Sequence, residues 1–202
     1  GGRDITEYLQ GLLNQNRGTL SYEFKTSAEK NLVQDIKNKF SFVSLDFNSD
    51  LQKAKLNDNF DVVYTLPDGK QVKLNDERFK CTEILFNPEM NEKTKKFLPI
   101  DKLFMNSIQK CDLSIQNQLC SNVILCGGTS KIENIVDRIE SCISQCMNCP
   151  INIRNKFGYE NSFLAWLGAS VVCSTPFFKE QLIPRDEYDD AGLQIIKRRC
   201  FN

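Results

Sequence analysis

One stretch of the chain combines small residues with a hydroxyl where a strand is expected to meet a helix. Asn122–Cys126 is short and apolar, as in a buried strand, and Gly127, Gly128 and Thr129 follow it directly. Small residues let a ligand approach the backbone, and unpaired amides at a helix start attract anions such as phosphate. From these residues alone a plain tight turn is the favoured interpretation, and an anion-binding turn is the alternative.

The histidine and cysteine content of the chain argues against nucleophilic pairs with histidine and against metal sites. The chain has no histidine, which removes Ser/His and Cys/His nucleophilic pairs and most catalytic zinc sites. Among its nine cysteines, Cys142, Cys146 and Cys149 are spaced like the buried face of one helix and have no obvious fourth ligand. We therefore predict core packing for them and no metal site.

Composition narrows the class of protein. The chain has 202 residues, 41% of them apolar, and 26 basic against 26 acidic side chains, which fits neither a disordered tail nor a basic nucleic-acid module. Its longest apolar run, Phe163–Cys173, is about half of the ~20 residues that a membrane span needs. An odd number of irregularly spaced cysteines favours a reducing compartment. The sequence predicts a soluble protein without a membrane segment or direct nucleic-acid binding.

Periodicity predicts the elements that would position the glycine turn. Apolar residues at helical spacing predict helices over Ile5–Leu13, Ser27–Phe40, Ile100–Ile108 and Ile132–Ile143, while strands are expected at Phe42–Leu45 and Ile151–Ile153. A Pro-Asp-Gly turn within Tyr64–Val72 predicts a hairpin, because proline presets the first turn angle and glycine accepts a positive φ.

An apolar stripe crosses the C-terminal region. Leu167, Val171, Thr175 and Phe178 lie at helical spacing, and Pro176 interrupts the series. Core packing is the favoured interpretation, and an exposed groove that receives a partner's helix is the alternative.

Together these pieces resemble the C-terminal half of an actin or actin-related protein. The matching segments occur in the family's order and cover nearly the whole chain: Gly2–Leu9, Ser27–Glu29, Asp35–Lys37, Leu45–Phe47, Leu66–Gly69, Glu77–Phe79, Leu85–Phe86, Asn106–Ile108, Lys110–Asp112, Gly127–Thr129, Asp137–Arg138, Trp166–Gly168, Glu187–Asp189 and Arg198–Phe201.

The resemblance implies the α/β, ribonuclease H-like actin-type ATPase fold, a mixed sheet with flanking helices plus a helical insertion. Residues 2–86 would form the outer insertion subdomain with its hairpin. Residues 87–160 would form the inner α/β subdomain that carries the Gly-Gly-Thr turn. Residues 161–202 would be helices that pack on an N-terminal half missing from this chain.

The family binds ATP or ADP with magnesium in a cleft, of which this chain would supply one wall. The resemblance places Gly2 near the nucleotide, Lys37 and Asn38 beside the adenine and ribose, and Gly127, Gly128 and Thr129 at the phosphates, with Lys131 next to them. Because the family's magnesium and water-orienting residues lie in the N-terminal half, the chain would hold no catalytic residue. A full-length parent could still be a slow ATPase.

Several residues depart from the family's pattern on the base side of the cleft. Gln34 and Asn38 replace an arginine and a ribose-binding glutamate, Lys131 and Ile132 replace a methionine and a tyrosine, and Ser162 replaces a lysine. Asparagine loses the extra stabilisation of a charged hydrogen bond, about 1.5 to 3 kcal/mol. Weakened ATP binding and a rebuilt pocket are both compatible with these changes.

Two functions are compatible with the resemblance. The parent is either a cytoskeletal, filament-forming or filament-associated protein, or a scaffold subunit of a larger assembly such as a chromatin-remodelling or motor-adaptor complex. The stripe Leu167, Val171, Thr175 and Phe178 corresponds to the groove that binds the family's partners. The implied partners are other actin-like subunits or actin-binding proteins, and the implied location is the cytoplasm, with the nucleus as an alternative.

Overall fold

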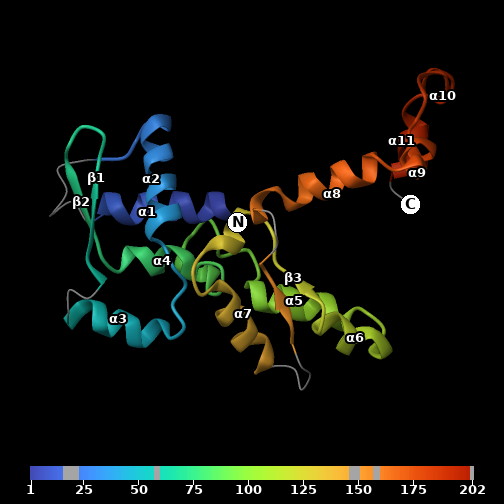
Figure 1. Ribbon diagram of the computed structural model, residues 1–202. Helices are drawn as coiled ribbons and strands as arrows, with labels where there is room; N and C mark the ends of the chain where they lie inside the picture. Colours follow the sequence, from blue (N-terminus) through green and yellow to red (C-terminus); the bar gives the residue numbers. More distant parts are fainter. Residues whose placement is uncertain (16–22, 57–59, 146–150, 157–159, 201–202) are drawn as a thin grey trace. The chain divides into compact units, whose positions relative to one another are not determined.

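Helices and two small sheets form the chain, which in this computed structural model divides into two compact units, Gly1–Asn161 and Ser162–Asn202 (Figure 1). The structure describes residues 1–15, 23–56, 60–145, 151–156 and 160–200. The elements of the first unit are α1 (Gly2–Gln15), α2 (Ser27–Phe40), α3 (Phe47–Leu56), β1 (Val62–Thr65), β2 (Gln71–Leu74), α4 (Glu77–Glu83), η2 (Pro88–Met90), α5 (Ile100–Gln109), α6 (Leu113–Cys120), β3 (Val123–Ile124), η3 (Gly128–Lys131), α7 (Ile135–Ser144) and β4 (Ile153–Arg154).

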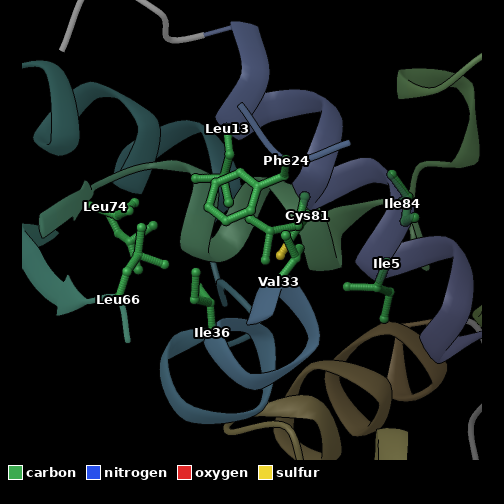
Figure 2. Close-up of a cluster of buried hydrophobic side chains, with 11 residues drawn as sticks. Ile5, Leu13, Phe24, Val33, Ile36, Leu66, Leu74, Cys81 and Ile84 are labelled. Carbon is green, nitrogen blue, oxygen red and sulfur yellow. The ribbon is translucent and has the colours of Figure 1, made fainter. Parts of the chain in front are cut away.

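The first unit has a core built around α1, which packs against α2 and α4. Ile5, Leu9 and Leu13 recur at the spacing of one helical face, and each is at most 1% exposed. Side chains from α2, the β1–β2 hairpin and α4 converge on the same cluster, as Figure 2 shows. The helical spacing predicted for Ile5–Leu13 is confirmed, and this burial fixes the side of α1 that faces α2.

Helix α2 is held at its N-terminus by a capping box. The Thr26 hydroxyl accepts a hydrogen bond from the Glu29 amide at 3.3 Å, and the Glu29 carboxylate accepts one from the Thr26 amide at 2.6 Å. These bonds satisfy two amide groups that a helix start otherwise leaves without partners. The cap and the buried face at Val33 and Ile36 therefore define where α2 begins and how it rotates.

The predicted hairpin is confirmed. Strands β1 and β2 pair antiparallel, with Tyr64 opposite Val72, and the backbone turns through Gly69 at a φ of 84°. A side chain at that φ would be strained, so glycine suits the turn. Val72 and Leu74 are fully buried and attach the hairpin to the core formed with α1 and α2.

A second core forms between α7 and the segments around it. Val43, Ile135, Ile139 and Ile143 are buried there, and side chains of α5, of β4 and of Leu125, which follows β3, pack around them. Strands β3 and β4 form a parallel pair of two residues each, separate from the antiparallel hairpin. Within the described residues the sheet structure is therefore two small sheets, where one mixed sheet was expected.

The strand predicted at Phe42–Leu45 is wrong. Phe42 makes only an isolated parallel bridge to Glu133, and the Val43 amide donates to the Glu133 carbonyl at 2.9 Å. The following carbonyls of Ser44 and Leu45 accept hydrogen bonds from the Arg138 guanidinium at 2.9 and 3.0 Å. A side chain of α7 thus takes the place of a neighbouring strand, which periodicity alone could not reveal.

Arg138 also ties α7 to α4. Its Nη2 lies 3.3 Å from Glu83 Oε1, and its guanidinium lies over the Phe86 ring at 5.1 Å from the centroid. Glu83 is buried, and its Oε2 has no hydrogen-bond partner among the described residues. Burial raises the pKa of the Glu83 carboxyl, and the positive charge of Arg138 partly opposes that shift. Arg138 is thus the polar link between the two cores.

The second unit is helical throughout the part that the structure describes. It contains η4 (Asn161–Phe163, which begins in the first unit), α8 (Leu164–Cys173), α9 (Pro176–Gln181), α10 (Arg185–Ala191) and α11 (Leu193–Cys200). The predicted break at Pro176 is confirmed, because α8 ends at Cys173 and proline occupies the first position of α9. Helix α8 has no buried residue.

Candidate anion-binding site

Three segments that are distant in the sequence meet beside the N-terminus of α1. Lys37 on α2 donates from Nζ to the Gly2 carbonyl at 3.2 Å. A Cβ placed on Gly2 would lie 3.3 Å from Thr129 Oγ1 and 3.6 Å from Lys37 Nζ. The missing side chain of Gly2 therefore leaves a small space between the lysine ammonium and the threonine hydroxyl. Of the residues that the resemblance assigns to a nucleotide, the structure brings these three together.

Lys37 is half-buried and lacks a counter-charge. Its hydrogen-bond acceptors are the Gly2 carbonyl and, at 3.1 Å, Thr6 Oγ1, and it makes no ion pair with any residue that the structure describes. Burial lowers the pKa of the Lys37 ammonium, because desolvation disfavours the charged form. An ammonium has three N–H donors, so one remains for an external acceptor. The electrostatics of this position favour an anion.

The Gly127 turn is fixed by its own hydrogen bonds. Gly127 has a φ of 90°, its amide donates to the Asn161 carbonyl at 2.9 Å, and its carbonyl accepts from Ser130 Oγ at 2.8 Å. The Asn161 side chain donates to Ser130 Oγ at 3.1 Å, which ties both sides of the turn together. Thr129 is thereby held in place by contacts that do not involve a ligand.

The element that follows this turn differs from the prediction. Gly128–Lys131 is a single 3-10 turn, and α7 begins only at Ile135, after Asn134 at a φ of 63°. Ile132 thus precedes the helix and packs against both hydrophobic clusters. Helical spacing of isoleucines extended the predicted helix by one turn, because Ile132 is buried for a reason other than helical periodicity.

Among the described residues, no side-chain hydrogen bond or ion pair links the other predicted contacts to Gly2, Lys37 or Thr129. Lys131 Nζ forms an ion pair with Glu160 Oε1 at 2.7 Å, and both side chains are about half exposed. Asn38 follows Lys37 on α2 and is exposed. Gly128 begins the 3-10 turn. Lys131 therefore already has a carboxylate of its own chain, in contrast to Lys37.

Sequence reasoning missed Thr6, Glu160 and Asn161. Thr6 is 3% exposed, donates to the Gly2 carbonyl at 3.0 Å and accepts from Lys37. Its place one helical turn after Gly2 is the signal that could have found it, since residues four apart lie on one helix face. Glu160 and Asn161 reach the turn from a distant segment, which no local pattern indicates.

The cysteine prediction is only partly covered by the structure. Cys142 lies on α7 and is partly buried, while Cys146 and Cys149 lie outside the described residues. No group of three or more metal-binding side chains occurs within the described part of the chain. All seven cysteines there are free thiols.

The apolar stripe lies largely outside the core that the described residues form. Val171 is 58% exposed and Thr175 is exposed, while Leu167 and Phe178 are partly buried. The Thr175 hydroxyl donates to the Val172 carbonyl at 2.7 Å, which caps the end of α8. Trp166, beside the stripe, is 71% exposed. The stripe thus belongs to an open apolar surface of the second unit.

Comparison with known proteins identifies the family of this chain. The family model for actin matches residues 2–201. The chain is 40% identical to "Putative actin-29" of Dictyostelium discoideum over 204 residues, which cover 99% of the chain and 51% of that protein. The chain therefore belongs to the actin family and is a divergent member of it.

Three further findings describe the chain. Membership implies the actin-type ATPase fold, and the described elements are helices with small sheets. The chain spans about half the length of the curated relative it matches. Across the described residues, we find no helix with the length and apolar character required to cross a lipid bilayer.

Proposed function

We propose that this chain forms one wall of a cleft that binds ATP or ADP together with magnesium. The observation that carries the proposal is the meeting of Gly2, Lys37 and Thr129 around a half-buried ammonium with no carboxylate partner among the described residues. The resemblance places Lys37 beside the adenine and ribose, so the ammonium would donate to that part of the nucleotide, and the negative charge of the nucleotide would offset its own. Membership of a family that generally binds ATP with magnesium supports the same assignment.

The residues present suit a nucleotide. Lys37 offers one N–H, Thr129 offers a hydroxyl, and the bare Cα of Gly2 leaves room between them. Charge-assisted hydrogen bonds from such donors are about twice as strong as neutral ones. Magnesium would accompany the phosphates, where it neutralises their charge. We place no catalytic residue on this chain, so its role is to bind and orient the nucleotide.

Titration calorimetry with ATP and magnesium tests the proposal. Lys37→Met should weaken binding at least tenfold, because a half-buried charged donor to the nucleotide is lost. The matched control is Lys39→Met on the same helix, since Lys39 is exposed and pairs with Asp35 at 2.8 Å. K39M should bind like the unaltered chain. Because one wall alone does not complete the cleft, the measurement uses a family-length protein that contains this chain. Equal affinity of K37M and K39M in that protein, or no binding by its unaltered form, would refute the nucleotide site.

The open apolar surface of the second unit extends the proposal. Trp166, Val171 and Phe177 are each more than half exposed, and relatives about twice as long have further chain available to cover them. We propose that residues 161–202 pack on the further half of a family-length protein. Residues 2–86 and 87–160 would act as its outer and inner subdomains. The stripe from Leu167 to Phe178 would contact actin-like subunits or actin-binding proteins. The setting would be the cytoplasmic cytoskeleton, with the nucleus as an alternative.

A scaffold subunit is the second candidate function. It is favoured by the ion pair between Lys131 and Glu160. In this pair a carboxylate of the same chain neutralises a lysine that would otherwise be available to a nucleotide. Sedimentation of a family-length protein that contains this chain, with ATP and magnesium, separates the two. A pellet that grows with protein concentration supports the filament function, and a protein that stays in the supernatant at all concentrations supports the scaffold.

A further inference from the structure

Asn161 joins the two chain segments that follow the carboxyl ends of β3 and β4. Its backbone carbonyl accepts from the Gly127 amide at 2.9 Å, and its Nδ2 donates to Ser130 Oγ at 3.1 Å and to the Asn155 carbonyl at 2.5 Å. Ser130 Oγ donates in turn to the Gly127 carbonyl at 2.8 Å, which closes a ring of hydrogen bonds through these residues. A side-chain amide has two N–H donors, so Asn161 uses both of them within this ring and its link to β4.

The ring holds both flanks of the turn that the resemblance places at the phosphates. Strands β3 and β4 are parallel, so their carboxyl ends lie at one edge of the pair, which is where ligands of α/β folds bind. The amides at the flanks are bonded, Gly127 to Asn161 and Ser130 to the Gly127 carbonyl. The amides of Gly128 and Thr129, between them, make no hydrogen bond with any residue that the structure describes. The middle of the turn is thus fixed in place while its own amides are unused.

We infer that Asn161 positions the Gly127–Thr129 turn for the phosphate groups of the nucleotide. This inference rests on the proposed nucleotide site and adds to it a positioning residue, which acts through the turn. Two successive glycines have a wide choice of backbone conformations, and fixing them costs conformational entropy. Because the ring fixes Gly127 at a φ of 90° before a ligand arrives, that cost falls on folding and not on binding.

The neighbouring ion pair is a weaker link between the same two segments. Lys131 and Glu160 are 2.7 Å apart, but both side chains are about half exposed, so water and salt screen their attraction. Ser130, which accepts from Asn161, is 5% exposed, and its hydrogen bonds meet less competition from water. We therefore assign the positioning of the turn to Asn161 and not to the ion pair.

The test measures binding of ATP with magnesium, and of adenosine, to a family-length protein that contains this chain. Asn161→Ala removes both donors, so ATP should bind about tenfold more weakly. Adenosine has no phosphate and should bind within about twofold of its affinity for the unaltered protein, whereas a general loss of structure would weaken both probes. Ser130→Ala breaks the same ring, so the double variant should bind ATP about as well as N161A alone, because residues of one hydrogen-bond network are not additive.

Asn14→Ala is the matched control, because Asn14 also links two segments through its side-chain amide. Its Nδ2 donates to the Phe24 carbonyl at 3.0 Å and its Oδ1 accepts from the Phe24 amide at 2.9 Å, near the end of α1 opposite to Gly2. N14A should lower thermal stability and leave the affinities for both probes unchanged. If N161A does not fold, NMR of the unaltered protein replaces it: the Asn161 side-chain amide resonances should move with ATP and magnesium and stay in place with adenosine.

The outcomes separate this inference from the proposed site. Four results would overturn the role of Asn161: undiminished ATP binding by folded N161A, an equal loss for adenosine, additive losses in the double variant, or an equal loss in N14A. In the NMR experiment, Asn161 resonances that ignore ATP would do the same. The proposed nucleotide site would survive each of these results. Absence of ATP binding by the unaltered protein would overturn both.

Discussion

Gly2 shows how the absence of a side chain can define a site. Its Cα borders the space between Lys37 Nζ and Thr129 Oγ1, and a Cβ there would lie 3.3 Å from the hydroxyl oxygen, closer than ordinary van der Waals contact. Thr129 has little freedom to retreat, because hydrogen bonds to Asn161 fix the turn on which it lies. An added methyl group would therefore occupy the room proposed for the nucleotide.

Gly2→Ala tests that space directly. We expect ATP to bind roughly tenfold more weakly, as for the loss of one charged hydrogen bond of about 1.5 kcal/mol. Gly11→Ala is the matched control on the same helix, because a Cβ there meets nothing within 4 Å. G11A should stabilise the chain by about 0.5 to 1 kcal/mol and leave ATP binding unchanged. Unchanged ATP binding by G2A in calorimetry would contradict the expectation.

Glu83 gives a pH-dependent prediction. Burial raises the pKa of its carboxyl in the folded chain above the ordinary value, so the folded state binds this proton more tightly than the unfolded state. Stability must then fall as pH rises from the ordinary pKa of glutamate through the raised one. Arg138 on α7 acts on the Glu83 carboxyl, and Cys142 on the same helix interacts with it as well.

Glu83→Gln removes the titrating group and keeps its shape. Because Glu83 is protonated in both states at low pH, unaltered chain and E83Q should have similar melting temperatures near pH 4. With rising pH the melting temperature of the unaltered chain should fall relative to that of E83Q. Circular dichroism melts between pH 4 and 7 measure the difference in melting temperature between the two proteins. Other carboxyls titrate in both proteins and so do not contribute to this difference; Glu7, whose pKa is lowered by nearby lysines, is one of them. A pH-independent difference would count against a buried, titrating Glu83.

At the scale of elements, local sequence signals predicted some helices and strands, and tertiary contacts decided others. The α1 face, α2 and the Pro-Asp-Gly hairpin were predictable, because each carries its own periodicity or turn chemistry. The segment from Phe42 to Leu45 looked like a strand, yet its carbonyls bond the Arg138 side chain. Its apolar pattern reflects burial of Val43, which an irregular segment can achieve as well as a strand.

The capping box of α2 supplies a prediction at this scale. Thr26→Ala should destabilise the chain by about 1 kcal/mol and lower the melting temperature by roughly 2 to 4 °C, because the Glu29 amide loses its acceptor. Ser27→Ala is the control, since Ser27 is exposed and is not the capping residue. Thermal melts of T26A and S27A measure both effects. Equal melting temperatures would show that the cap does not stabilise α2.

At the scale of the whole molecule, the second unit exposes large apolar side chains. Trp166, Phe177 and Leu193 are 71%, 62% and 69% exposed, far more than the core residues of the first unit. Apolar side chains of this size mark an interface where they gather on one exposed face. The family-length relative is about twice as long as the chain, so the surface has an available cover in the other half.

Tryptophan fluorescence tests this exposure, because Trp166 is the single tryptophan of the chain. In the isolated chain its emission should lie close to that of free tryptophan in water, and acrylamide should quench it efficiently. In a family-length protein containing this chain, the Trp166 signal should shift to shorter wavelength and resist quenching, because the indole leaves water. Burial of Trp166 already in the isolated chain would contradict the open surface.

The sequence by itself determined the family, the helices α1, α2, α5 and α7, the hairpin and the glycine turn. Each of these depends on residues close together in the chain, or on a series of motifs whose order is characteristic. Lys37, Gly2 and Thr129 could be assigned to a nucleotide only through the family resemblance. Their types alone do not distinguish a site from a tight turn and a surface lysine.

Only the tertiary structure decided which of those residues meet. It brought Gly2, Lys37 and Thr129 together, added Thr6 beneath the ammonium, and paired Lys131 with Glu160 instead. The physical reason is that hydrogen bonds and burial depend on distances between segments up to about a hundred residues apart, while periodicity reports only which side of each helix is apolar.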